Sequence, residues 1–189
     1  MRIIIGMSGA SGAIYGIRLL QVLQASAEVE THLILSESAQ VNIAVETDWS
    51  IADVKSLADV VHANKDIAAT VASGSFQTAG MIIAPCAIKT LSAVANSYAD
   101  SLLVRAADVV LKERRRLILV PRETPLHAGH CELMARAAHL GAIIAPPMPA
   151  HYIRPQSVEE LVDHHVGRLL DLFGLDTDLV RRWQGIRPN

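Results

Sequence analysis

The sequence predicts an α/β protein, a Rossmann-like (flavodoxin-like) three-layer sandwich in which helices cover both faces of a mainly parallel sheet. Short aliphatic runs alternate with helical periodicities along the chain, which is the pattern of consecutive βαβ units. Hydrophobic residues make up 51% of the 189 residues and aromatic residues only 4%, a composition suited to strands buried on both faces. No linker or low-complexity stretch divides the chain, so we expect a single domain over residues 1–189.

The expected strands are short apolar runs that end at small polar residues or at proline. They cover residues 3–5, 29–35, 80–84, 117–120 and 142–145. Between them, apolar residues recur every three or four positions, which predicts helices after the first loop, from about Glu37, over 50–59, after Cys86, and over 100–114 and 132–139. A capping box at Ser157 and Glu160 predicts the start of a last helix, which we expect to reach Phe173. Residues 60–78 are expected to be irregular.

The first strand runs directly into a glycine-rich loop, residues 6–12, and then into a helix. This layout presents backbone N–H groups and the positive end of a helix to an anion, and Ser11 adds a hydroxyl. No Gly-Lys-Ser/Thr follows, which excludes a P-loop, and the dinucleotide spacing G-x-G-x-x-G is not met. The loop therefore favours a mononucleotide phosphate, with an unliganded strand–helix turn as the structural alternative.

The net charge and the cysteine content indicate which partners and which cellular compartment to expect. The formal net charge of −2 provides no basic field for nucleic acid or an anionic membrane, so we expect neither partner. The two cysteines, Cys86 and Cys131, form no CxxC pair and are expected to be reduced. With no signal peptide and no apolar run of membrane-spanning length, we expect a cytoplasmic protein. The histidine pairs at 127/130 and 164/165 form no convincing ligand set with cysteine or carboxylate residues, so we expect no metal.

Ligands of parallel α/β sheets bind beyond the carboxyl ends of the strands. This rule selects the residues that follow the expected strands, in segments where small polar residues concentrate. They are Gly9, Ala10, Ser11, Ser36, Ala87, Ile88, Lys89, Thr90, Arg122 and Glu123, together with the segment after Pro147.

Six motifs occur in a consistent order over nearly the whole chain, at residues 6–12, 73–76, 85–90, 105–109, 120–126 and 146–150. Together they resemble the UbiX family of flavin prenyltransferases. The resemblance implies a metal-independent transferase of an alkyl group other than methyl, which moves a dimethylallyl group from dimethylallyl phosphate to N5 and C6 of reduced FMN. The product, prenylated FMN, would pass to a UbiD-type decarboxylase. The resemblance further implies a homo-dodecamer with active sites at subunit interfaces.

The resemblance also assigns roles to residues at matching positions. FMN would be bound by Gly9, Ala10, Ser11, Ser36, Ala87, Ile88, Lys89, Thr90, Arg105 and Arg122. Tyr152 and Arg168 would bind dimethylallyl phosphate with Lys112 close by, while Glu123 would donate or relay a proton and Glu46 would face the pocket. The family usually has Ser in the place of Ala87, a difference of one hydrogen bond worth about 0.5–1.5 kcal/mol.

Elementary chemistry supports these roles. Arginine, lysine and tyrosine stabilise a departing phosphate through charge-assisted hydrogen bonds, and an electron-rich ring stabilises a developing allylic cation by stacking. Each residue also has a structural interpretation. Arg122 and Glu123 would be a surface pair, Tyr152 would cover an apolar edge, and Arg168 would pair with Asp163 or Asp171.

Two other function classes stay open at this point. One is a flavin-dependent decarboxylase of the related cysteine-decarboxylase fold, whose members typically carry a catalytic histidine and a Pro-x-Met-Asn segment. Here the corresponding stretch reads Pro147-Met148-Pro149, and no Pro-x-Met-Asn occurs. The other is a non-catalytic FMN-binding accessory subunit of a decarboxylase.

Overall fold

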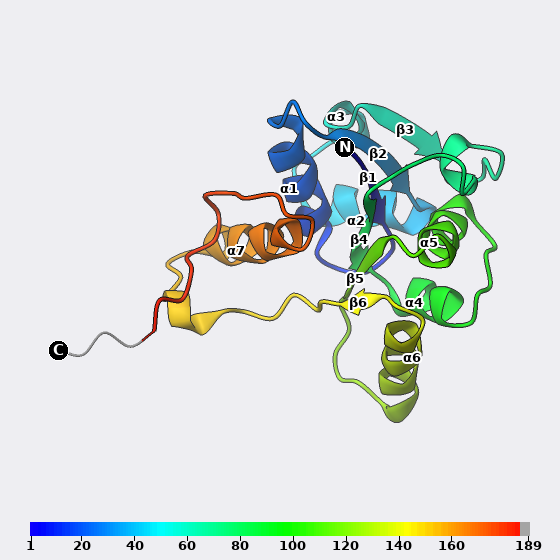
Figure 1. The fold of residues 1–189 in the computed structure, drawn as a ribbon. Coiled ribbons are helices and arrows are strands. Elements are labelled where there is room, and N and C mark those ends of the chain that lie inside the picture. Colours follow the sequence, from blue (N-terminus) through cyan, green and yellow to red (C-terminus); the bar gives the residue numbers. More distant parts are fainter. Residues whose placement is uncertain (186–189) are drawn as a thin grey trace. The chain divides into compact units, whose positions relative to one another are not determined.

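The computed structural model describes residues 1–185, in which six parallel strands form one sheet in the order β3-β2-β1-β4-β5-β6 (Figure 1). The strands are β1 (Arg2–Met7), β2 (Glu30–Leu35), β3 (Val60–Ala63), β4 (Gly80–Cys86), β5 (Arg116–Pro121) and β6 (Ile143–Ile144). With the edge strand β3 set aside, the strand order is the 2-1-3-4-5 of flavodoxin, and β3 extends it to the 3-2-1-4-5-6 of the doubly wound dinucleotide fold. The predicted α/β sandwich is confirmed.

Helices cover the sheet in two groups. One group packs together from α1 (Ala13–Gln24), α2 (Glu37–Glu46) and α3 (Ile51–Ser56), and the other from α4 (Ile88–Ala95), α5 (Leu102–Lys112) and α6 (Ala128–His139). The chain moves outward from β1 through the first group and from β4 in the opposite direction through the second. Because parallel crossovers are right-handed, the two groups lie on opposite faces of the sheet.

The strands supply apolar side chains to both faces. Ile4, Ile34, Met81 and Ile83 pack in one cluster with residues of α4 and α5, while Ile3 and Ile5 alternate with Ile4 along β1 and are also fully buried. Truncating one of these buried side chains to alanine typically costs about 2–5 kcal/mol. This double burial explains why the strands read as continuous aliphatic runs in the sequence.

Some predicted boundaries were wrong. Residues 60–78 were expected to be irregular, but they contain β3 and a 3₁₀ turn, η1 (Thr70–Ala72). Strand β3 has four residues that alternate between half-buried and exposed, a weak signal compared with the other strands. Strand β4 continues through Pro85, across a cis Ala84–Pro85 peptide, to Cys86. Helix α6 begins before the expected Glu132, at Ala128, without a side-chain cap to mark its start.

The chain divides into two compact units, Met1–Pro147 and Met148–Asn189. The second unit contains a 3₁₀ turn, η2 (His151–Ile153), and helix α7 (Val158–Asp171), which ends two residues before the expected Phe173. Ser157 caps α7 as predicted, because its Oγ accepts from the Glu160 backbone N–H at 3.2 Å. The reciprocal bond is displaced by one residue, since Glu160 Oε2 accepts from the N–H of Gln156, before the N-cap, at 3.0 Å. In the described residues no helix is long and apolar enough to cross a membrane.

Candidate active site

The point where the strand order reverses lies between β1 and β4, and a buried serine links the two strands there. Ser8 directly follows β1 and is 2% exposed. Its hydroxyl donates to the Pro85 carbonyl at 3.1 Å and accepts from the Ala87 N–H at 2.8 Å. The carboxyl end of β1 is thereby fixed to the loop that leads into α4.

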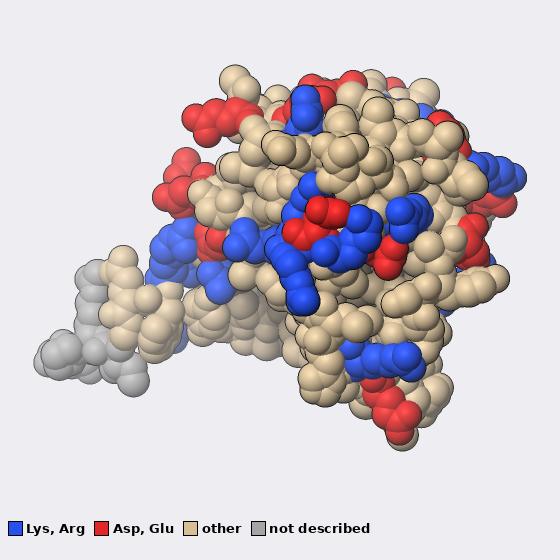
Figure 2. Space-filling model, turned by 45° about the vertical axis from the view of Figure 1, so that its right-hand side comes forward, with Lys and Arg blue, Asp and Glu red and all other residues tan. Residues whose placement is uncertain are grey.

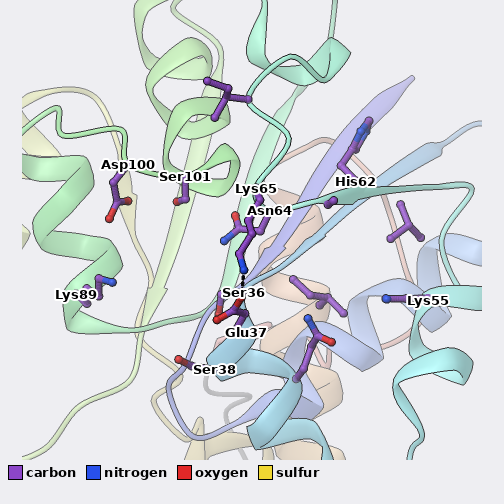
Figure 3. A pocket seen from close by; sticks show the side chains of 15 residues that line it. Ser36, Glu37, Ser38, Lys55, His62, Asn64, Lys65, Lys89, Asp100 and Ser101 are labelled. Atoms are coloured by element: carbon purple, nitrogen blue, oxygen red, sulfur yellow. Dashed lines mark ion pairs between the residues drawn. The ribbon is translucent and has the colours of Figure 1, made fainter.

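A cavity of about 180 Å³ opens over this point, lined by mostly polar residues of several loops and by residues of the helices that follow them. It adjoins a wider groove of about 760 Å³ (Figure 3), and the two share Ser36, Ser38, Asn64, Lys89, Asp100 and Ser101. Gly9 also lines the cavity, and a Cβ at this position would overlap the Ser38 side chain. Only glycine allows the first loop to approach α2 this closely.

Helix α4 presents an uncapped N-terminus to the cavity. Its N-cap residue, Ala87, has φ −71° and ψ 153°, close to the −71° and 160° of Ser36. The Ser36 hydroxyl accepts from the Ala39 N–H at 3.0 Å, whereas Ala87 has no hydroxyl to cap the first turn of α4. Lys89 and Thr90, both in that first turn, line the cavity. An open helix end, several hydroxyls and a lysine together suit a phosphate group.

The N-terminus of α1, in contrast, already has an anionic partner. Glu46, the last residue of α2, accepts through Oε2 from the Gly12 N–H at 2.8 Å and the Ala13 N–H at 3.0 Å. Gly12 has φ +104°, a conformation that glycine adopts readily. The sequence argument assigned this helix end to a phosphate, but the structure places the Glu46 carboxylate there.

The segment after β5 brings further charge to the same edge. The Arg122 N–H donates to the Cys86 carbonyl at 3.3 Å, which ties the ends of β5 and β4 together. The Arg122 charge lowers the pKa of Tyr15 on α1, although burial has the larger effect and raises that pKa overall. Glu123 is exposed, and its Oε1 accepts from the Thr124 N–H at 3.0 Å. Burial raises the pKa of the Cys86 thiol to about 12, as expected for a small buried hydrophobe rather than a nucleophile.

Two predicted site residues lie elsewhere in this unit. Helix α5 starts at the cavity, where Leu103 and Val104 line the wall, and runs for about 16 Å to Lys112 near the amino end of β5. Lys112 forms an ion pair with its neighbour Glu113 at that opposite edge of the sheet. Arg105, one turn into α5, pairs with Asp108 at 2.8 Å and donates to the Ala72 carbonyl at 3.2 Å. A single copy of the unit therefore does not bring Lys112 or Arg105 to the cavity.

Tyr152 and Arg168 belong to the second unit. The Tyr152 hydroxyl lies 3.1 Å from Nε2 of His164, and its ring meets the Trp183 ring edge to face with centroids 5.8 Å apart. Arg168 pairs with Asp171 at 2.6 Å, as the structural interpretation expected. Arg182 binds the same carboxylate, and these hydrogen bonds, the Arg182 bond foremost, hold the pKa of Asp171 below its usual range.

Sequence reasoning missed several residues of the cavity wall, including Ser8, Ser38, Asn64 and Ser101. Ser8 and Asn64 directly follow the carboxyl ends of β1 and β3, so position alone could have found them once β3 was recognised. Asn64 also caps α5, because its Oδ1 accepts from the Leu103 N–H at 3.0 Å and its carbonyl from the Leu102 N–H at 2.9 Å.

On the face shown in Figure 2, several basic side chains lie near the middle of the view with acidic side chains among them. In the part of the chain that the structure describes, no group of three or more His, Cys, Asp or Glu residues is arranged to hold a metal ion.

A doubly wound sheet whose strand order reverses beside a cavity suited to a phosphate group is typical of mononucleotide-binding α/β proteins. Comparison with known proteins identifies the class: a profile of the family described as Flavoprotein matches residues 1–170. The flavin prenyltransferase UbiX of Escherichia coli K12 is 58% identical over 186 residues, which cover 97% of this chain and 98% of that relative. The chain belongs to the UbiX flavin prenyltransferase family.

Two crystal structures share the fold at high similarity. A dodecameric FMN-dependent UbiX-like decarboxylase from Escherichia coli O157:H7 has a TM-score of 0.96 at 51% identity, over 98% of this chain and all of that one. AnUbiX (PadA1), in complex with FMN and dimethylallyl pyrophosphate, has a TM-score of 0.96 at 50% identity, over 98% of both chains. The family predicted from the sequence motifs is confirmed.

Proposed function

We propose that this protein is a flavin prenyltransferase that joins the dimethylallyl group of dimethylallyl phosphate to N5 and C6 of reduced FMN. The observation that carries the proposal is the uncapped N-terminus of α4 at a hydroxyl-lined cavity over the switch point, in a member of the UbiX family. Such an end binds a phosphate monoester through N–H groups and the helix dipole. The reaction needs no metal, because cationic and hydrogen-bonding side chains stabilise the departing phosphate.

The FMN phosphate would bind at the start of α4, with hydrogen bonds from Ser36, Lys89 and Thr90. Its site is completed by Gly9, Ala10, Ser11, Ala87, Ile88 and Arg122, as the family resemblance implies. The Ala87 N–H is already bonded to Ser8, so at this position the chain offers FMN neither a hydroxyl nor a free N–H. We assign the main-chain binding at the end of α4 to the N–H groups of Ile88 and Lys89, with Thr90 contributing its hydroxyl.

Tyr152 and Arg168 would bind the phosphate of the prenyl donor, while Glu123 relays a proton and Glu46 faces the reacting groups. Lys112 would act on a site of another copy of the chain, which fits its place at the far end of α5 from the cavity. Arg105, whose guanidinium is held by Asp108 and the Ala72 carbonyl, would do the same. A dodecameric relative supports assembly into a homo-dodecamer in which active sites form between copies. We further propose that residues 1–189 act as one functional domain in the cytoplasm and supply prenylated FMN to a UbiD-type decarboxylase.

An anaerobic assay tests the reaction. Purified protein is mixed with reduced FMN and dimethylallyl phosphate, and the extracted flavin is analysed by mass spectrometry. A flavin heavier by one isoprene unit supports the proposal, and dimethylallyl pyrophosphate in parallel identifies the preferred donor. Arg168→Ala should weaken the dimethylallyl phosphate complex far more than the FMN complex, because the lost guanidinium pairs with the donor's phosphate. Equal losses for both ligands would indicate a folding defect.

A second candidate function is FMN-dependent decarboxylation, the activity for which the Escherichia coli O157:H7 relative is named. Bound but unmodified FMN in the same assay would point to this activity or to an accessory subunit. Release of carbon dioxide from carboxylated thiols or aromatic acids would then separate the enzyme from the carrier.

A further inference from the structure

The second unit contains a histidine that contacts the proposed donor-binding tyrosine. His164 on α7 is 5% exposed, whereas Tyr152 is 51% exposed. Nε2 of His164 and the Tyr152 hydroxyl are 3.1 Å apart, and the two rings meet edge to face at 82°. Trp183 packs edge to face on the same tyrosine, so the ring is held between two aromatic neighbours.

The surroundings of His164 decide which of its nitrogens carries the proton. Nδ1 is buried and has no hydrogen-bond partner among the described residues. A buried N–H without an acceptor is costlier than an unused lone pair, so a neutral ring carries its proton on Nε2. Burial, and secondly the charge of Arg168, lower the pKa of His164 and keep the ring neutral. Asp171 adds an opposing but smaller effect on that pKa.

The tautomer sets the direction of the hydrogen bond. An Nε2–H group donates to the Tyr152 oxygen, so the tyrosine's own O–H proton stays available for an outside acceptor. If the proton were on Nδ1 instead, the tyrosine O–H would donate to Nε2 of His164 and present only a lone pair to the ligand. A lone pair repels a phosphate oxygen, whereas an O–H donates to it.

Arg168 lies one turn beyond His164 on the same face of α7. Its guanidinium is held by Asp171 at 2.6 Å, and Arg182 binds both oxygens of that carboxylate at 3.1 and 2.9 Å. The tyrosine hydroxyl and the guanidinium are thus each held by a residue of α7, His164 and Asp171. Both groups can donate a hydrogen bond to a phosphate oxygen.

We propose that His164 is a positioning residue for the prenyl donor, which fixes the Tyr152 hydroxyl so that its proton points to a phosphate oxygen of dimethylallyl phosphate. This inference rests on the proposed prenyl transfer. His164 does not touch the donor itself, and its effect passes entirely through Tyr152.

The test is steady-state kinetics of prenyl transfer at saturating reduced FMN, on the full-length protein under anaerobic conditions. His164→Leu removes the N–H group that donates to Tyr152. It should raise the KM for dimethylallyl phosphate about 3- to 10-fold, the size of one hydrogen bond, and leave FMN affinity unchanged. His164→Gln places an amide N–H near the position of Nε2 and should restore most of the affinity. His151→Gln, an exposed change beside Tyr152, is the matched control and should keep the wild-type KM.

A double-mutant cycle with Tyr152→Phe separates positioning from packing. If His164 acts through the hydroxyl, His164→Leu has no further effect on KM in the Tyr152→Phe background. An unchanged KM in His164→Leu, an equal loss in both backgrounds, or a parallel loss of FMN affinity overturns the inference. A wild-type protein that forms no prenylated flavin overturns the proposed function instead, so the two failures are distinguishable.

Discussion

Substituting serine for Ala87 tests the interpretation of the α4 end directly. The backbone at Ala87 (φ −71°, ψ 153°) nearly coincides with that of Ser50 (φ −74°, ψ 153°), whose hydroxyl accepts from the Asp53 N–H at 3.1 Å. Ala87→Ser should therefore accept from the Thr90 N–H without any change of backbone. A serine N-cap in place of alanine is worth about 0.5–2 kcal/mol. For a chain of this length, each kcal/mol raises the melting temperature by about 2–4 °C.

The same change should tighten FMN binding. While its oxygen accepts from the helix, the new hydroxyl keeps its proton for a phosphate oxygen, which adds one hydrogen bond. We expect the Kd for FMN to fall about 2- to 10-fold, measured by fluorescence titration or calorimetry. Thermal unfolding is followed without flavin, at one fixed protein concentration, because assembly and ligand both shift the melting temperature.

Ala93→Ser is the matched control, because Ala93 lines the same cavity from within α4, where a hydroxyl cannot cap the helix. Serine there should lower stability by a few tenths of a kcal/mol through helix propensity. An unchanged melting temperature in Ala87→Ser would refute the claim that the N-terminus of α4 lacks a cap which a serine hydroxyl can supply. A weaker FMN complex would refute the placement of the phosphate at this end of α4.

Three further predictions follow from contacts elsewhere. Glu46→Ala leaves two N–H groups of α1 without their partner and should destabilise the protein by about 0.5–2 kcal/mol in thermal unfolding, with Glu46→Gln less affected because an amide oxygen still accepts. Glu123→Gln should leave FMN bound but slow the formation of prenylated flavin tenfold or more, a barrier increase of about 1.4 kcal/mol, and unchanged turnover would remove Glu123 from the mechanism. Burial, with a smaller effect of the His164 charge, lowers the pKa of His165 to about 4, so stability present above pH 6.5 should be lost as the pH falls from 6.5 toward 4. His165→Gln should flatten this part of the stability–pH curve, and an equally steep curve in the variant would contradict the assignment.

Most of the sheet was predictable because its strands are buried on both faces and read as uninterrupted aliphatic runs. β3 was not, since its Val-Val-His-Ala sequence is short and half exposed at the edge of the sheet. The start of α6 was missed because His127 precedes it without a side-chain cap, and Gly129 in its first turn weakens the helical pattern.

The site was predictable where its residues directly follow a strand, as do Ser36 and Ala87. It was not predictable where the contact joins distant parts of the chain. Glu46 accepts hydrogen bonds from the start of α1 although the two are 34 residues apart, and no local sequence pattern predicts this contact. The position of Lys112 depends on the length of α5, which carries it from the cavity to the opposite edge of the sheet. The family motifs identify Lys112 but do not show whether it would act in its own copy of the chain or, as proposed, in another.

The two edge strands of the sheet limit how copies of this chain could pair in the proposed assembly. β6 has two residues and β3 has four, so each border of the described sheet offers only a short row of unpaired main-chain groups. Short border strands discourage the addition of a neighbour's strand, which is a common route to aggregation. In the proposed dodecamer, association between copies would therefore depend on side chains of helices and loops. Those surfaces can be altered one residue at a time without disturbing the sheet that positions the cavity.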